Sequence, residues 1–250
     1  MKISPQKIQE LIDQLDPCGI PQIRSIYQAR NQVTKRRKKL GIFSGSFNPM
    51  TISHVEMIDA AQSRFKLDEV LLVLAKANVD KEIFGLSLAK RLITLSYYAE
   101  NRDNFSVAVS SHGRYIEKIE ALKSVFPSGT EFCFIVGYDT FVRIFDYKYY
   151  ADMYAELDQL FGQCRLIVAN RDNHDAKAIR DFLSFPDRQV YADKIDLIGL
   201  SDFHAGVSST DIRSRLENSQ SISDLVPAEI TQLVIDYYQE TINPRFKELD

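Results

Sequence analysis

Two short stretches of this sequence carry residue types that suit the binding of phosphate groups. The first, "GIFSGSFNPMTISHVEM" at residues 41–57, runs from an apolar strand pattern through a turn into helical spacing. Gly45 allows the backbone to turn sharply beside a ligand, Ser46 and Thr51 offer hydroxyls, and the helix start offers free N–H groups and a positive dipole end. His54, in the first helical turn, is placed either to donate to the same anion or simply to cap the helix.

The second stretch is "GVSSTDIRSRL" at residues 206–216. Hydroxyl side chains begin another helix at Ser208, Ser209 and Thr210, and Arg213 follows about one turn later. A guanidinium binds phosphate oxygens bidentately, so this helix start also predicts a polyanion seat. The simpler alternative is a capped helix whose arginine faces solvent. Two such seats on one chain fit a triphosphate better than chance capping does.

The elements that must position these residues follow an alternating pattern from residue 40 onward. Strands are expected at 40–44, 69–74, 105–109, 132–136, 165–169 and about 189–200, and amphipathic helices at 55–65, 88–100, 115–126, 149–161 and 175–183. This alternation predicts an α/β fold, an open and mostly parallel sheet with helices on both faces. Ligands of such sheets bind beyond the carboxyl ends of the strands, where the first stretch would lie.

An N-terminal helical extension is expected at residues 1–39, ahead of one domain at 40–250. Ser4 and Pro5 begin a helix, and residues 22–34 are predicted to form a second helix that ends in the basic run "KRRKK" at 35–39. We interpret this run as a solvated helix end, with an anion-attracting patch as the alternative.

Composition limits the classes of protein that this chain can represent. With 250 residues, 45% of them hydrophobic, the chain can bury a substantial core. A formal net charge of −3 gives no overall field for nucleic acid or an anionic membrane. Three well-separated cysteines argue against a disulfide framework or a zinc site. Since no apolar run approaches the roughly 18 residues of a membrane span, we expect a cytoplasmic protein without a membrane partner; a homo-oligomer is compatible with the sequence.

The two phosphate-suited stretches also resemble those of a known family. "GSFNPMTISH" and "VSSTDIR" are similar to the (H/T)xGH and ISSTxIR motifs of the nucleotidylyltransferase superfamily, most of all those of the nicotinamide or nicotinate mononucleotide adenylyltransferases. "FIVGYDTFVRIF", "LIVANR" and "SQSISDLVPAEITQLVIDYY" resemble further segments, so that the resemblance covers roughly residues 40–242. One departure is Ser53, where the common motif has glycine.

The resemblance implies a Rossmann-like adenylyltransferase of NAD biosynthesis. Such an enzyme joins nicotinamide or nicotinate mononucleotide (NMN or NaMN) to the α-phosphate of ATP and releases pyrophosphate. His54 and Arg213 would be catalytic by stabilising phosphate charge, and Mg²⁺ would bind through the substrate phosphates rather than through a protein metal site. The implied ATP-binding residues are Gly45, Ser46, Phe47, Thr51, His54, Gly137, Asp139, Ser208, Ser209, Thr210 and Arg213. The implied mononucleotide-binding residues are Ser46, Phe47, Lys81, Asp139 and Arg171.

Some of these expectations have alternatives. The chain contains no tryptophan to stack on a pyridine ring, and the aromatic side chains that offer a ring face instead, unless they are core residues, are Tyr138, Phe145, Tyr147 and Tyr149. Lys76 is a second candidate beside Lys81, and Arg171 would otherwise form a structural ion pair.

Three other functions are weighed against adenylyl transfer. One is a different reaction of the superfamily, such as cytidylyl transfer to a phosphorylated alcohol. A second is an ATP-binding or ATP-hydrolysing regulatory protein that has lost the pyridine site. The third, nucleic-acid binding through "KRRKK", rests on five residues of an acidic chain.

Overall fold

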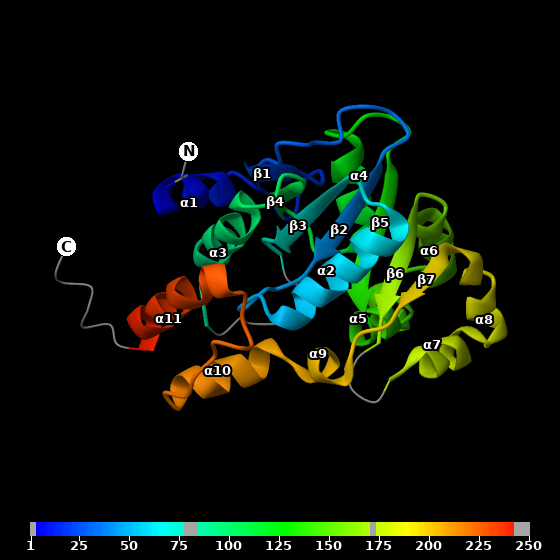
Figure 1. The fold of residues 1–250 in the computed structure, drawn as a ribbon. Coiled ribbons are helices and arrows are strands. Elements are labelled where there is room, and N and C mark those ends of the chain that lie inside the picture. The colour runs from blue at the N-terminus through cyan, green and yellow to red at the C-terminus, as the bar shows by residue number, and fades with distance from the viewer. Residues whose placement is uncertain (1–3, 78–84, 171–173, 243–250) are drawn as a thin grey trace.

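The computed structural model describes residues 4–77, 85–170 and 174–242, and Figure 1 shows a twisted sheet between two layers of helices. Within these residues the sheet has seven strands in the order β1-β4-β3-β2-β5-β6-β7. The strands are β1 (Ile23–Tyr27), β2 (Lys39–Ser44), β3 (Glu69–Ala75), β4 (Phe105–Ser110), β5 (Glu131–Gly137), β6 (Cys164–Ala169) and β7 (Ile195–Ile198). All pairs are parallel except β1 with β4. The predicted α/β class is therefore confirmed.

The helices connect these strands and cover both faces of the sheet. They are α1 (Pro5–Asp13), α2 (Ile52–Phe65), α3 (Leu88–Glu100), α4 (Tyr115–Lys123), α5 (Tyr138–Ile144), α6 (Met153–Phe161), α7 (Ala176–Leu183), α8 (Pro186–Gln189), α9 (Asp202–Gly206), α10 (Ser209–Glu217) and α11 (Ala228–Ile242), with short 3₁₀ helices η1 (Tyr147–Tyr149) and η2 (Ala192–Lys194). Helices α1, α2, α3, α10 and α11 pack on one face, whereas α4, α5, α6 and α7 pack on the other.

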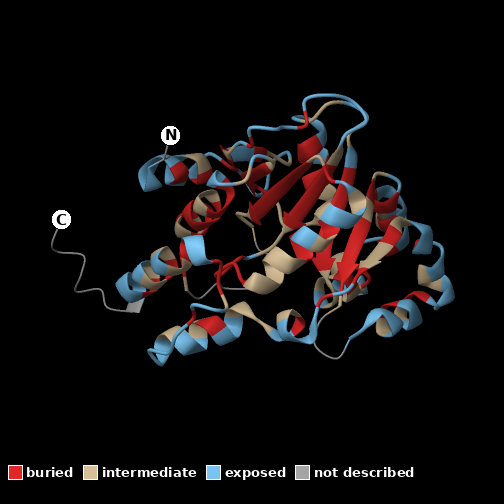
Figure 2. Ribbon diagram, in the orientation of Figure 1, coloured by how far each residue is buried: buried red, intermediate tan, exposed pale blue. Residues whose placement is uncertain are grey.

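Side chains of the central strands alternate between two buried clusters. Along β3, Val70, Leu72 and Leu74 belong to the cluster under α2 and α3. Leu71 and Val73 belong to the cluster under α4 and α6. Figure 2 shows the resulting buried sheet, with most exposed residues on the outer surfaces of the helices and in the loops. In the strands, the exposed residues are Arg24 and Ser25 of β1 and Glu131 at the start of β5. Burial on both faces explains why these strands are continuous apolar runs in the sequence. The first five predicted strands are confirmed to within one residue at each end.

The second helix expected at residues 22–34 is wrong, because β1 lies there and pairs with the edge strand β4. Ile23 and Ile26 are three residues apart, a spacing typical of one face of a helix. In the structure they lie on opposite faces of the strand, Ile23 in one core cluster and Ile26 in the other. A strand that is buried on both faces can therefore imitate helical spacing. The division of the chain at residue 40 stays a prediction, but β1 belongs to the common sheet.

Two further expectations need correction. The basic run at 35–39 is not a helix end, since residues 35–38 form an exposed turn and Lys39 is the first residue of β2. The strand expected at about 189–200 is shorter than predicted: α8 and η2 occupy its first part, and only Ile195–Ile198 pairs with β6. Pro186 starts α8 and Asp187 lies in its first turn, both favourable at a helix N-terminus.

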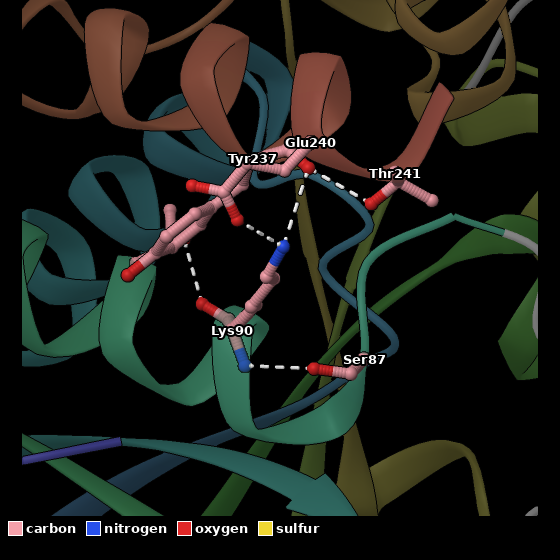
Figure 3. A network of polar contacts seen from close by, with 6 residues as sticks. Ser87, Lys90, Tyr237, Glu240 and Thr241 are labelled. Carbon is pink, nitrogen blue, oxygen red and sulfur yellow. Dashed lines mark hydrogen bonds and ion pairs between the residues drawn. The ribbon is translucent and has the colours of Figure 1, made fainter. Parts of the chain in front are cut away.

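The C-terminal helix α11 is fixed against α3 by the polar contacts in Figure 3. The Lys90 ammonium pairs with the Glu240 carboxylate at 2.7 Å and lies 4.9 Å from the centre of the Tyr237 ring. The backbone N–H of Lys90 donates to the hydroxyl of Ser87, the N-cap of α3. This junction holds Tyr238, the residue after Tyr237, in a buried position close to the loop that follows β2. None of the described helices is long and apolar enough to cross a membrane.

Candidate active site

The strand order places a crevice between β2 and β5. From β2 the chain proceeds outward through β3 and β4, and it then returns to β5 on the other side of β2. The loops that follow β2 and β5 consequently run in opposite directions, which is where open α/β sheets bind ligands. A cavity of about 640 Å³ occupies this position, lined by the loop after β2, the starts of α4 and α5, and the start of α10.

The loop after β2 has a conformation that depends on Gly45. A Cβ atom on this residue would lie 3.3 Å from the ring of Phe47, closer than ordinary contact distance. Phe47 itself has a φ of 42°, in the left-handed region that few side chains adopt. The turn tucks the Phe47 ring into the core, where it is 1% exposed. As a result Gly45 and Ser46 line the cavity and Phe47 does not.

Buried polar groups hold this loop from behind. Arg91 is 5% exposed, and its guanidinium donates from Nη1 to the Ser46 carbonyl at 2.8 Å and from Nε to the Leu86 carbonyl at 3.1 Å. The Asn48 side chain accepts from the Leu86 N–H at 3.1 Å and from the Tyr238 hydroxyl at 2.8 Å. Burial lowers the pKa of Arg91 to about 10, so the guanidinium stays charged at neutral pH and adds positive potential behind the loop.

The start of α2 fixes the orientation of His54. Thr51 is the N-cap, and its hydroxyl accepts from the His54 backbone N–H at 3.4 Å. His54 returns the contact, because its Nδ1 accepts from the Thr51 backbone N–H at 3.0 Å. This is a capping box with histidine in the place where glutamate is usual. Since Nδ1 is an acceptor, the neutral ring carries its proton on Nε2. His54 lines the cavity, and the cap fixes which ring nitrogen carries the proton.

The start of α10 is bonded directly to the same loop. Ser208 is the N-cap and accepts from the Asp211 N–H at 3.1 Å. The Ser209 hydroxyl donates to the Pro49 carbonyl at 2.8 Å. Arg213 donates from Nη1 to the Asn48 carbonyl at 2.9 Å and from Nη2 to the Thr210 hydroxyl at 3.0 Å. The two phosphate-suited stretches of the sequence, about 160 residues apart, therefore form one continuous wall.

Most of the site residues expected from the sequence come together around this cavity. Those that line it are Gly45, Ser46, His54, Gly137, Asp139, Ser208, Ser209, Thr210 and Arg213. Phe47 and Thr51 are buried and do not line the cavity, so their side chains do not reach a ligand there. Thr51 instead orients His54. Lys81 and Arg171 lie outside the described residues.

The alternative candidates separate in the same way. Of the four aromatic residues proposed in place of tryptophan, Tyr149 lines the cavity. Phe145 is a core residue, Tyr147 is exposed and bonded to the Tyr154 hydroxyl at 2.6 Å, and Tyr138 stacks on His174 at 4.2 Å.

The second lysine candidate, Lys76, makes structural contacts with the end of α1. Its Nζ donates to the Leu15 carbonyl at 2.6 Å and to the Asp13 carbonyl at 3.3 Å, at the C-terminal end of α1. A cation there satisfies carbonyls left open by the helix. In this structure Lys76 therefore caps α1, and its candidacy for a phosphate contact stays a prediction.

Sequence reasoning missed two buried cations of this site, Arg91 and Lys118. Each occupies an otherwise apolar helical stripe: Leu88 and Leu95 flank Arg91 at helical spacing, and Tyr115 and Leu122 flank Lys118. A cation within such a stripe is a local signal that could have found both. Lys118 lines the cavity, whereas Arg91 supports it from behind.

The charge of the cavity wall differs from that of the whole chain. Its basic side chains are His54, Arg114, Lys118, Arg143 and Arg213, and its acidic side chains are Asp139 and Glu156. Within the described ranges, no group of three or more His, Cys, Asp or Glu side chains is arranged to hold a metal ion. The wall can bind a polyanion through backbone N–H groups, hydroxyls and cations, as expected for phosphate positioning.

Comparisons with known proteins agree with this geometry. A family model described as cytidylyltransferase-like matches residues 42–215. The chain is 25% identical over 211 residues to a probable nicotinate-nucleotide adenylyltransferase of Thermoanaerobacter sp., covering 81% of this chain and 94% of the relative. It is 26% identical over 213 residues to a protein of the same name from Geobacter sulfurreducens, covering 78% and 95%.

Solved structures resemble the fold. The nicotinic acid mononucleotide adenylyltransferase of Plasmodium falciparum complexed with NaAD superimposes with a TM-score of 0.61 at 19% identity, covering 83% of this chain and 100% of that chain. The same enzyme complexed with APC gives a TM-score of 0.58 at 17% identity, with the same coverage. At these identities the likeness establishes the arrangement of the sheet and helices.

Proposed function

Because this chain belongs to the cytidylyltransferase-like family and is a nucleotidyltransferase, we propose that its cavity joins ATP to nicotinate mononucleotide. The product would be the corresponding dinucleotide of NAD biosynthesis, with release of pyrophosphate. One observation carries the proposal: the loop after β2 and the start of α10 form a single donor-rich wall, joined through the carbonyls of Asn48 and Pro49. The names of the relatives favour the nicotinate acceptor.

The proposed step exchanges one phosphorus–oxygen bond for another. An oxygen of the acceptor's 5′-phosphate attacks the α-phosphorus of ATP, the bond between that phosphorus and the bridging oxygen breaks, and pyrophosphate leaves with the electron pair. The attacking phosphate is already an anion near neutral pH, so the protein needs no general base and forms no covalent intermediate. Its task is to align two phosphates and to stabilise the charge that shifts to the leaving group.

Each part of the wall has a role in this step. We assign the Nε2–H of His54 to the α-phosphate; the capping box with Thr51, which leaves the ring proton on Nε2, and the position of His54 in the cavity lining support this assignment. Arg213 and the hydroxyls at the start of α10 would hold the departing pyrophosphate, since a guanidinium and a helix start both favour phosphate oxygens. Asp139, in the first turn of α5, would accept from ribose hydroxyls.

Mg²⁺ would arrive as part of the substrate, bound to the phosphates of ATP. The wall suits this arrangement because its side chains at the phosphate seats are donors rather than carboxylate ligands. The bound ion would lower the negative charge that the attacking phosphate must approach. The chain's own residues then position the complex: His54 at the α-phosphate and Arg213 beyond it.

The decisive experiment measures both products of the reaction. Purified protein is incubated with Mg²⁺-ATP and either mononucleotide, and dinucleotide and pyrophosphate are followed together, with His54→Ala as the matched control. We expect equal amounts of both products from NaMN, and a large loss in the variant. A parallel reaction with CTP tests the cytidylyl alternative. ATP binding without dinucleotide from either mononucleotide would refute the proposed acceptor and favour a regulatory role.

A further inference from the structure

The cavity extends from one face of the sheet to the other. Its α10 wall belongs to the face that carries α2 and α3, as the core residue Ile212 shows. Its opposite wall is formed by the start of α4, by the residues around α5 and η1, and by α6. This wall belongs to the other face, because Ile119 of α4 and Leu157 of α6 lie in the second core cluster. We call this second part the acceptor lobe and define it by Arg114, Tyr115, Lys118, Tyr149, Tyr150 and Glu156.

Lys118 is the unusual residue of the acceptor lobe. It is 2% exposed, and its ammonium donates to the carbonyl of Gly113, a residue that also lines the cavity. The ring of Tyr115 lies 5.4 Å from the same Nζ. None of the ion pairs in the described parts of the chain includes Lys118. Burying an ammonium without an anionic partner costs free energy, and such a cost is common at sites that bind a ligand of opposite charge.

The nearby carboxylates are engaged elsewhere. Glu156 pairs with the guanidinium of Arg114. Glu117 accepts from the Arg114 backbone N–H at 3.0 Å and so completes the start of α4. These contacts leave the ammonium of Lys118 with one carbonyl and one ring face as its direct partners. The charge of Glu117 also attracts it, but burial outweighs this attraction and lowers the pKa of Lys118. An anionic group from the substrate would therefore improve the electrostatics of this lobe.

The aromatic walls of the lobe indicate what kind of anion fits. In the proposed step the acceptor's phosphate meets the α-phosphate of ATP beside His54, at the other end of the cavity, so the pyridine ring is the part of the acceptor left for this lobe. The Tyr150 hydroxyl donates to the Ile144 carbonyl at 2.5 Å, and the Arg114 guanidinium lies 5.4 Å from the centre of the Tyr150 ring. Tyr149 lines the same lobe. A flat ring that bears a carboxylate matches this combination of ring faces and a buried cation.

We propose that the ammonium of Lys118 binds the ring carboxylate of nicotinate mononucleotide and thereby makes the enzyme prefer the acid over the amide. This inference rests on the proposed function. Burial lowers the pKa of Lys118 to about 8, so the ammonium remains mostly charged at neutral pH, and a bound carboxylate would stabilise that charge further. The amide of NMN offers no negative charge and leaves the buried cation uncompensated.

The test compares the two mononucleotides in Lys118→Met, Lys118→Arg and the wild type. Methionine keeps the length of the side chain but removes the charge, and arginine keeps the charge. Lys123→Met is the control, because Lys123 is an exposed lysine of the same helix. The readouts are kcat/KM for NaMN, for NMN and for ATP, with thermal melting to verify that each variant is folded.

We expect Lys118→Met to lower kcat/KM for NaMN about 10- to 100-fold, the usual effect of losing a hydrogen bond to a charged group, and to change the value for NMN less than about threefold. Lys118→Arg should retain part of the preference, and Lys123→Met all of it. An equal loss for both mononucleotides or an unchanged ratio would overturn the role of Lys118 alone. A wild type that prefers NMN would overturn both that role and the nicotinate acceptor of the proposed function. A wild type that uses neither mononucleotide would overturn the proposed function as well.

Discussion

His54 has two roles in this structure that substitution can separate. Its Nδ1 accepts from the Thr51 N–H at 3.0 Å and completes the capping box of α2. Its Nε2–H is the donor assigned to the α-phosphate. His54→Ala removes both roles. His54→Glu restores the cap, because glutamate is the usual third residue of a capping box and an acid is favourable in the first turn, but it offers no donor and repels phosphate.

The expected magnitudes follow from these contacts. Loss of a capping hydrogen bond costs about 1 kcal/mol, which lowers the melting temperature of a chain of this size by roughly 2–4 °C. Loss of a donor to charge that develops in the reaction lowers kcat about 10²- to 10³-fold. Stability should therefore rank His54→Glu above His54→Ala, whereas turnover should rank wild type above His54→Ala and His54→Ala above His54→Glu.

The assay combines thermal melting with initial rates of pyrophosphate release under saturating substrates. Opposite rankings of the two variants in stability and in turnover would establish that the cap and the donor are independent. If His54→Glu turns over at the wild-type rate, His54 does not act as the donor and our mechanism fails. If both variants lose the same stability, the capping box contributes nothing and the orientation of the ring has another cause.

Two further predictions concern groups outside the cavity wall. Tyr238→Phe removes the hydroxyl that donates to Asn48 Oδ1 at 2.8 Å. We expect urea unfolding to show a loss of about 1 kcal/mol in unfolding free energy, and rates at varied ATP to show a higher KM for ATP. An unchanged KM would show that Asn48 keeps its position without this hydrogen bond. Glu69 is 2% exposed and accepts from the Val33 N–H at 2.6 Å, and burial raises its pKa. The folded state therefore favours the protonated carboxyl, and the stability that this group contributes is lost as pH rises from about 4.5 through the folded pKa. Glu69→Gln should remove this pH dependence of the unfolding free energy, measured between pH 4.5 and 7. A variant with the same pH profile as the wild type would contradict the role of Glu69.

The parts of the fold that the sequence predicted well are those encoded locally. Strands β2 to β6 are buried on both faces and so appear as continuous apolar runs. Helix α3 has the ends that its amphipathic pattern predicted, and in the structure the Ser87 side chain caps its start. Hydroxyl N-caps such as Ser4 and Ser208 also mark helix starts through contacts within three residues.

The failures occurred where a distant partner decides the conformation. Strand β1 exists because its backbone pairs with β4, at least eighty residues later in the chain. Its isoleucine spacing suits either one helical face or the two faces of a strand, and no neighbouring residue resolves that choice. Likewise, the pairing of β7 with β6 begins only at Ile195, so residues 189–194 do not extend the strand although the segment is apolar in part.

For the site, the sequence by itself determined the chemistry of the two phosphate seats: a glycine turn, hydroxyl caps, a histidine and an arginine at helix starts. Only the tertiary structure decided that these seats form one wall, since Arg213 reaches the Asn48 carbonyl across 165 positions of the chain and Tyr238 reaches the same residue across 190. The structure also decided that Lys118 is buried in the opposite lobe. The physical reason is that caps and turns are satisfied by neighbouring backbone groups, whereas burial and long-range hydrogen bonds depend on which surfaces the packed sheet brings together.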